Sequence, residues 1–167
     1  MIGTRAAAIR LLVLDVDGVL TDGRLYFGPR GEALKVFHVR DGHGLVELRR
    51  AGVEVALISG RRSPMVTARC RELGVRHLYQ GVRDKGTVLA RLRARLGIAR
   101  AASACVVDDL PDLPLLAGVA LSFAVADAHP RVRRAADLVT RLPGGHGAVR
   151  EVCDRLLAAR VPAGRRR

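Results

Sequence analysis

Aromatic side chains are scarce in this 167-residue sequence, which has no tryptophan, two tyrosines and three phenylalanines. Proteins that bind single-stranded nucleic acid commonly stack the bases on aromatic rings, and this composition leaves little for such stacking. The scarcity argues against a nucleic-acid-binding surface, and we expect no nucleic-acid partner.

Cysteines and long apolar runs are scarce as well. Cys70, Cys105 and Cys153 are far apart, odd in number and form no Cys-x-x-Cys pair, so we interpret them as buried thiols in a reducing compartment. No apolar run approaches the roughly 20 residues of a membrane span. The first apolar segment is interrupted by Asp15, which does not fit a signal peptide. We therefore expect a cytoplasmic protein with no membrane partner.

Acidic residues are outnumbered by basic ones, 16 against 29, and the net charge is +13. Such a surface can attract nucleic acid or an anionic metabolite. Many arginines, however, punctuate helical segments such as 91–95, a pattern typical of a solvated basic face. Hydrophobic residues make up 49% of the chain, enough for a full core in a single domain that we expect to span residues 1–167.

The most informative segment is Leu11–Gly23, where four apolar residues lead directly into Asp15 and Asp17. A continuous apolar run of this kind is typical of a strand buried in a parallel sheet, and open α/β sheets place ligands at the carboxyl ends of such strands. Aspartates this close repel each other, and Mg²⁺ can offset that repulsion because it prefers oxygen ligands. One aspartate could then attack phosphorus while the other transfers protons. The alternative is a strand that ends in a solvated acidic turn.

Two later strands also end in polar residues. Ser59 follows the strand expected at 53–58, where its hydroxyl can donate to a phosphoryl oxygen, and Gly60 allows close backbone approach. Asp108 follows the strand expected at 104–107 and would complete the cation site. These strand ends meet at one edge of a parallel sheet, so we expect one shared site.

Several nearby residues have two interpretations. Arg40 is a candidate for gripping a phosphate or carboxylate, and the adjacent Asp41 could cap a helix. Asp112 could hold a metal-bound water or orient neighbouring ligands, whereas Asp109 could cap the helix that follows it. Lys85 stands in the first helical turn, where it opposes the helix dipole and has no obvious stabilising purpose, so a solvated surface lysine is the alternative.

Strands and helices alternate along the chain. We expect strands at 11–14, 53–58, 77–81, 104–107, 121–125 and 137–140, a β-hairpin insertion at 24–37, and helices ending near 51, 74, 96, 117 and 159. This alternation predicts an α/β fold with a single Rossmann-like, doubly wound parallel sheet. The hairpin is too short to form a cap domain, so the site must be open or covered by something outside the chain.

The segment from Asp15 to Thr21 resembles the Asp-x-Asp-Gly-x-x-Thr/Ser motif of the haloacid dehalogenase-like phosphatases. Across nearly the whole chain, the sequence resembles the capless branch of that superfamily, the 3-deoxy-D-manno-octulosonate 8-phosphate phosphatases. The resemblance is carried by residues 15–23, 39–42, 77–81, 108–109, 125–130 and 147–153.

The resemblance implies hydrolysis of a phosphorylated eight-carbon acidic sugar, a step in lipopolysaccharide synthesis. In that mechanism Asp15 becomes an aspartyl phosphate, Asp17 transfers protons, and Ser59 and Lys85 stabilise the phosphoryl oxygens. The family's Mg²⁺ would be held by Asp15, Asp108 and the backbone carbonyl of Asp17.

The resemblance also implies which residues contact the substrate and how the chains assemble. By resemblance, Arg40, Gly60, Arg61 and His146 would contact the substrate. The family forms a homotetramer whose hairpins and tails cover neighbouring active sites. This implies a homotetramer here, with a C-terminal tail at 144–167 that closes a neighbour's site.

Two residues depart from the family's pattern. Val107 stands where the family usually has glycine before the aspartate pair, and we expect its side chain to crowd the metal loop. His146 stands where the family usually has arginine. His129, near the end of the fifth strand, is either a catalytic group or a residue that orders its loop.

Two rival functions are compatible with the sequence. The first is a phosphatase of nine-carbon sugar acid 9-phosphates, which the catalytic residues do not distinguish. The second is a non-catalytic assembly or nucleic-acid-binding module on the same fold. The presence of Asp15, Asp17, Ser59, Lys85 and Asp108 together argues against loss of catalysis.

Overall fold

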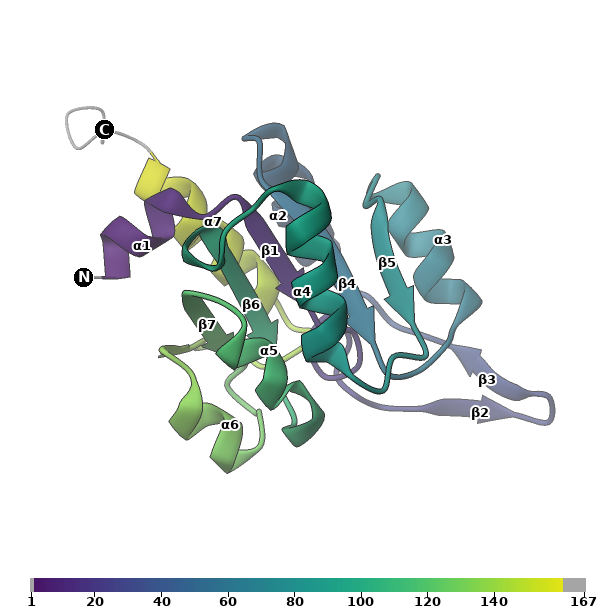
Figure 1. Ribbon diagram of the computed structural model, residues 1–167. Coiled ribbons are helices and arrows are strands. Elements are labelled where there is room, and N and C mark those ends of the chain that lie inside the picture. Colours follow the sequence, from purple (N-terminus) through teal and green to yellow (C-terminus); the bar gives the residue numbers. More distant parts are fainter. Residues whose placement is uncertain (1, 161–167) are drawn as a thin grey trace.

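Six parallel strands form the central sheet of the protein in a computed structural model that describes residues 2–160 (Figure 1). The strands are β1 (Leu11–Leu14), β4 (Glu54–Ser59), β5 (His77–Gln80), β6 (Ser103–Val107), β7 (Leu121–Ala124) and β8 (Leu138–Val139). They lie in the order β5-β4-β1-β6-β7-β8. The predicted α/β fold with a doubly wound parallel sheet is confirmed.

β1 lies in the middle of the sheet and pairs with β4 on one side and β6 on the other. Its four side chains are fully buried, and burial of each leucine or valine contributes about 1.5–3 kcal/mol. The chain first builds β4 and β5 on one side of β1 and then crosses to β6 on the other. The carboxyl end of β1 is thus a topological switch point, the usual ligand position in such sheets.

Helices cover both faces of the sheet. They are α1 (Ile2–Ala8), α2 (Val39–Arg50), α3 (Pro64–Glu72), α4 (Lys85–Leu96), α5 (Leu113–Ala117), α6 (Pro130–Ala135) and α7 (Ala148–Arg160). α2 and α7 pack together on one face, and α4 and α5 pack together on the other (Figure 1). Among the described residues, no helix has the length and apolar character that crossing a bilayer requires.

Most elements start and end within one or two residues of the prediction, but the helices α1 and α6 were not predicted. α6 begins with the signal of an N-cap followed by proline, because His129 is its N-cap and Pro130 its first residue. The Nδ1 atom of His129 accepts a hydrogen bond from the backbone N–H of Arg131 at 3.2 Å. Of the two interpretations of His129, the structure supports the ordering of its loop.

The start of α2 corrects the interpretation of Asp41 as a helix cap. His38 is the N-cap, and its Nδ1 accepts a hydrogen bond from the backbone N–H of Arg40 at 3.2 Å. Asp41 lies inside the helix, is buried, and accepts a hydrogen bond from the backbone N–H of Arg150 at 2.7 Å. Its carboxylate therefore joins α2 to the start of α7, where the unpaired N–H groups of a helix favour a negative charge.

The predicted hairpin is present as β2 (Tyr26–Gly28) and β3 (Gly31–Leu34), an antiparallel pair that projects away from the central sheet (Figure 1). Its turn is shorter than predicted. Large apolar side chains on and beside the hairpin are exposed, namely Leu25, Phe27, Leu34, Val36 and Val39. The hairpin therefore presents apolar surface that nothing in the described chain covers.

Residues 144–160, the described part of the predicted C-terminal tail, pack against their own domain. The backbone N–H of Gly144 donates to Asp127 Oδ1 at 2.9 Å, and that of Gly145 donates to the carbonyl of Val19 at 3.0 Å. α7 then buries an apolar face against the rest of the molecule. These residues are therefore held against their own chain, and residues 161–167 of the predicted tail lie outside the described residues.

Candidate active site

Seven of the nine predicted site residues line one pocket of about 220 Å³. They are Asp15, Asp17, Ser59, Gly60, Arg61, Lys85 and Asp108. β1, β4 and β6 are parallel neighbours, so the residues at their carboxyl ends meet at one edge of the sheet. Asp15, Ser59 and Asp108 reach the pocket in this way.

Arg40 and His146 do not line this pocket. They lie in a separate open groove of about 700 Å³ between the start of α2 and α7, together with Arg150 and Glu151. The Nδ1 atom of His146 is 2.7 Å from the carbonyl oxygen of Gly144, within its own turn. Within one chain, these two residues are therefore set apart from the aspartates.

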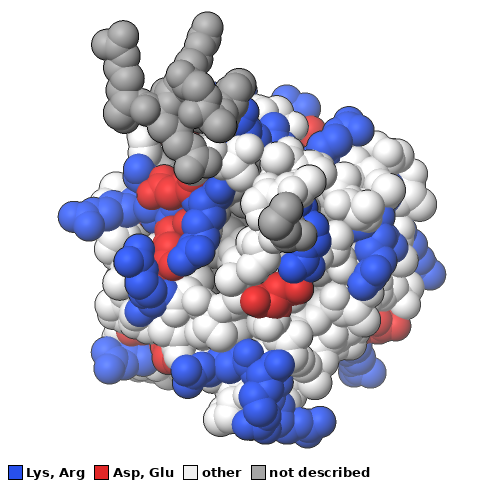
Figure 2. All heavy atoms as spheres, turned by 90° about the vertical axis from the view of Figure 1, so that its left-hand side faces the viewer, with Lys and Arg blue, Asp and Glu red and all other residues white. Residues whose placement is uncertain are grey.

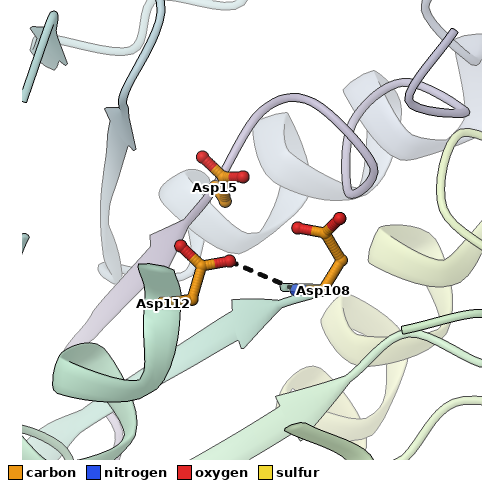
Figure 3. A group of neighbouring side chains, drawn as sticks. All are labelled: Asp15, Asp108 and Asp112. Carbon is orange, nitrogen blue, oxygen red and sulfur yellow. Dashed lines mark hydrogen bonds between the residues drawn. The ribbon is translucent and has the colours of Figure 1, made fainter. Parts of the chain in front are cut away.

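Three carboxylates converge at the pocket: those of Asp15, Asp108 and Asp112 (Figure 3). One oxygen from each lies within 4.8 Å of the others. Asp108 Oδ1 is buried and has no hydrogen-bond partner in the described part of the chain. A buried, unpaired carboxylate oxygen is costly, and a hard divalent cation would satisfy it. The donor set therefore fits a metal such as Mg²⁺.

Gly18 allows the loop after β1 to approach Asp108. Its φ is +88°, and a Cβ at this position would lie 2.0 Å from Asp108 Oδ2. A side chain there would be strained and would displace the carboxylate. The glycine of the Asp-x-Asp-Gly motif thus has a steric role in building the carboxylate cluster.

Burial and crowding raise the pKa of two members of the cluster. The pKa of Asp15 rises to about 6, mainly through burial and then through the charge of Asp112, although Lys85 opposes the rise. The pKa of Asp108 rises to about 9, because burial and the charges of Asp15 and Asp112 all disfavour its ionised form. The cluster holds more negative charge than its surroundings neutralise.

Lys85 is the positive charge within this cluster. Its side chain is 5% exposed, and Nζ lies 2.7 Å from Asp15 Oδ1 and 2.6 Å from Asp112 Oδ1. Burial alone would lower its pKa, but the two carboxylates outweigh burial and raise it. The interpretation as a solvated surface lysine is wrong, because the first turn of α4 directs this side chain into the site.

Asp112 and Asp109 have different roles in the loop after β6. Asp112 Oδ2 accepts hydrogen bonds from the backbone N–H groups of Asp108 at 3.3 Å and Asp109 at 3.4 Å, which orients the loop. Asp109 caps the short 3₁₀ turn Leu110–Asp112, not α5 as predicted, through a 2.8 Å bond from the N–H of Leu110. Asp112 belongs to the carboxylate cluster, although it was not among the predicted site residues.

Val107 fits its strand without backbone strain. It pairs with Ala124 of β7, is fully buried, and has an ordinary negative φ. A valine in this conformation does not need the freedom of a glycine. The expectation that Val107 distorts the metal loop is therefore not supported by the backbone.

Sequence reasoning missed Lys35 and Glu32, which come from the hairpin. Lys35 Nζ forms an ion pair with Asp17 Oδ1 and lies 3.0 Å from Glu32 Oε1. Arg61 Nη2 lies 3.2 Å from the same Glu32 oxygen, and Arg61 Nε lies 3.8 Å from Asp17 Oδ2. Leu34 and Val36 on either side of Lys35 are exposed, so the side chain of Lys35 lies on the opposite side of the chain, toward Asp17.

A family model and a curated relative both match this chain. A family model described as haloacid dehalogenase-like hydrolase matches residues 77–151. The chain is 53% identical over 155 residues to the 3-deoxy-D-manno-octulosonate 8-phosphate phosphatase of Escherichia coli strain K12, covering 93% of this chain and 82% of the relative.

Solved structures agree with this similarity. The phosphatase of that name from Yersinia pestis superposes with a TM-score of 0.92 at 50% identity, covering 95% of this chain and 85% of the other. The one from Moraxella catarrhalis, solved in complex with magnesium, phosphate and KDO, gives a TM-score of 0.92 at 41% identity, covering 95% and 91%.

Proposed function

The chain belongs to the 3-deoxy-D-manno-octulosonate 8-phosphate phosphatase family of haloacid dehalogenase-like hydrolases, and on this premise we propose that it is a Mg²⁺-dependent phosphatase. The substrate is 3-deoxy-D-manno-octulosonate 8-phosphate, and the products are the free sugar acid and phosphate. The observation that carries the proposal is the carboxylate of Asp15, held by Lys85 at the carboxyl end of the central strand, beside Asp108 and Asp112.

Asp15 is the nucleophile in this proposal. Lys85 binds one of its oxygens at 2.7 Å, which orients the carboxylate toward the pocket. The carboxylate forms a bond to phosphorus as the bond from phosphorus to the sugar oxygen breaks, which leaves an aspartyl phosphate. Water then attacks this phosphorus, and Asp15 is released as a carboxylate.

Asp17 is the proton carrier. It lines the same pocket two residues further along the chain. It donates a proton to the departing sugar oxygen and later removes one from the attacking water, so it returns to its starting state. Ser59 and Lys85, both buried and lining the same pocket as Asp15, stabilise the phosphoryl oxygens.

The residues that would hold Mg²⁺ are Asp15, Asp108 and the backbone carbonyl of Asp17. The close approach of carboxylates and the unpaired Asp108 Oδ1 support this assignment. When bound, Mg²⁺ neutralises the charge of the carboxylates and the phosphate, so that an anion can approach an anion. Asp112 orients the loop that carries Asp108.

Gly60 and Arg61 would contact the substrate directly, since both line the pocket. Arg40 and His146 line a different groove, so any contact with substrate would be made in the site of another subunit. We accordingly propose a homotetramer in which the exposed apolar side chains of the hairpin are covered by other copies. The three free, buried cysteines are consistent with a cytoplasmic location.

Phosphate release from a panel of sugar phosphates tests the proposal. We expect rapid, Mg²⁺-dependent release from the eight-carbon 8-phosphate, slower release from a nine-carbon sugar acid 9-phosphate, and none after chelation of the metal. Asp15→Asn should fold normally and release no phosphate. A preference for the nine-carbon substrate would overturn the assigned substrate, and release from no substrate would favour a non-catalytic module.

A further inference from the structure

Lysine is rare in this chain, and both lysines are buried at the aspartate motif. Of the 29 basic residues, only Lys35 and Lys85 are lysines, and the others are arginines. Lys85 contacts Asp15, and Lys35 contacts Asp17. The side chains of the two lysines are 5% and 2% exposed. An ammonium is a compact point charge, whereas a guanidinium is a wide planar fork that needs more room.

Lys35 acts on Asp17 and not on the pocket. Asp17 lines the pocket, but Lys35 does not, and its ammonium is occupied by Asp17 and Glu32. An ammonium with no free face toward the pocket is poorly placed to bind the substrate. Its effect on the reaction must therefore pass through the carboxylate of Asp17.

Lys35 belongs to a balanced cluster with Asp17, Glu32 and Arg61. Burial alone would raise the pKa of Glu32, but the ammonium of Lys35 and the guanidinium of Arg61 lower it, which keeps Glu32 ionised. The Glu32 carboxylate contacts both Lys35 and Arg61, so Lys35 has a fixed anchor on its own hairpin. With Glu32 as anchor, the ammonium can hold the Asp17 carboxylate in one orientation.

We propose that Lys35 is a positioning residue that aims the Asp17 carboxylate at the oxygen of the leaving sugar. This inference rests on the proposed phosphatase function and adds a residue from the hairpin to its machinery. The hairpin carries Lys35 between the exposed Leu34 and Val36. Its position therefore affects proton transfer by Asp17. General acid catalysis contributes about 10²–10⁴-fold, and misdirection of the acid forfeits part of that factor.

The test is a series of phosphate esters whose leaving groups differ in basicity. A nitrophenolate leaves readily without a proton, whereas a sugar alkoxide needs one. For Lys35→Met, we expect the single-turnover rate of leaving-group release, the step before water attacks the aspartyl phosphate, to fall roughly tenfold or more with the sugar phosphate and less than about threefold with 4-nitrophenyl phosphate. The KM of the sugar phosphate should change little. Lys35→Arg should recover part of the loss.

Two variants separate this role from general damage. Arg24→Met removes a cation from an exposed ion pair with Asp22 at the base of the hairpin, and it should leave the single-turnover rate unchanged. Glu32→Gln combined with Lys35→Met keeps the cluster electrically balanced, so it protects the fold while removing the ammonium. This double variant should still show the loss in single-turnover rate for the sugar phosphate.

A double-mutant cycle with Asp17→Asn completes the test, because residues that act as one unit are not additive. In single-turnover measurements, Lys35→Met should cause no further loss once Asp17 is replaced. An equal fold-loss on all esters, or full additivity with Asp17→Asn, would overturn the proposal. A rise in KM with kcat intact would instead assign Lys35 to substrate binding. A wild-type enzyme that cleaves aryl esters but not the sugar phosphate would refute the assigned substrate only, since the aryl series still tests Lys35.

Discussion

Asp15, Asp108 and Asp112 place three carboxylates around one point, and Lys85 supplies a single buried positive charge to them. Such a cluster is unstable while all its members are ionised, so without a bound metal ion it retains protons. The raised pKa values of Asp15 and Asp108 express this tendency. Metal binding, proton release and folding stability should consequently be linked at this site.

Metal-free protein should become less stable as the pH rises. The pKa of Asp15 is about 6 and that of Asp108 about 9 in the folded protein, against 3.8 as the ordinary value. The folded state therefore binds these protons more tightly than the unfolded state does. The resulting stability is complete below about pH 4 and is lost as the pH passes through about 6 and then about 9.

Thermal unfolding with EDTA and with Mg²⁺ measures this linkage. We expect Mg²⁺ to raise Tm more at high pH than at low pH, because the metal binds the deprotonated carboxylates. Calorimetric titrations in buffers of different ionisation enthalpy should detect proton release on metal binding. Asp108→Asn should weaken both effects. An equal rise of Tm at pH 6 and pH 8.5 would contradict the linkage.

The residues found from sequence are those that follow a strand or start a helix. Asp15, Ser59 and Asp108 each end an apolar run, and parallel strand ends must meet. Lys35 could not be found in this way, since its contact with Asp17 depends on how the hairpin folds back over the sheet. The local sequence near residue 35 does not specify how the hairpin is oriented relative to the sheet.

At the scale of elements, the loop after β1 is supported by the turn before α7. Gly144 and Gly145 pack directly on the backbone of residues 18–22. From sequence alone, adjacent glycines such as these indicate only a turn. Their actual role depends on a contact between segments more than a hundred residues apart, which local sequence does not encode. The doubly wound parallel sheet, in contrast, follows from the alternation of elements, and that prediction is confirmed.

Gly144→Ala should disturb the catalytic loop. A Cβ at this position would lie 1.7 Å from the carbonyl oxygen of Gly18, and backbone cannot move aside as a side chain can. We expect a loss of stability of about 1–3 kcal/mol, as for other overpacked sites, together with weaker Mg²⁺ binding and lower kcat. Thermal unfolding, metal titration and phosphate release measure these effects.

Gly3→Ala is the matched control for this substitution. A Cβ on Gly3 would meet no atom within 4 Å, and the residue lies in α1 far along the chain from the catalytic loop. Alanine is a better helix former than glycine, so stability should stay equal or rise slightly. If Gly144→Ala behaves like Gly3→Ala, the turn does not support the loop.

At the scale of the whole molecule, the excess of basic residues does not form one continuous patch on the face shown in Figure 2, where acidic side chains lie among the arginines. Ion pairs account for several of them, including Arg5 with Asp137 at 2.8 Å and Arg155 with Glu151 at 3.0 Å. A nucleic-acid-binding surface would present an uninterrupted basic stripe. This face therefore matches the predicted solvated basic surface.

The exposed hairpin is the feature that a single chain leaves unexplained, and Phe27→Ser tests whether other copies cover it. Phe27 is 65% exposed, so the substitution removes little packing within the chain and should barely change monomer stability. If hairpins meet in a homotetramer, light scattering after size-exclusion chromatography should show a shift from four chains toward one or two. KM for the sugar phosphate should rise as the site loses its cover, while hydrolysis of 4-nitrophenyl phosphate should persist.

Ile2→Ser, which replaces a 41% exposed side chain on α1, should change neither mass nor KM. An unchanged tetramer with Phe27→Ser would mean that the chains associate through another surface.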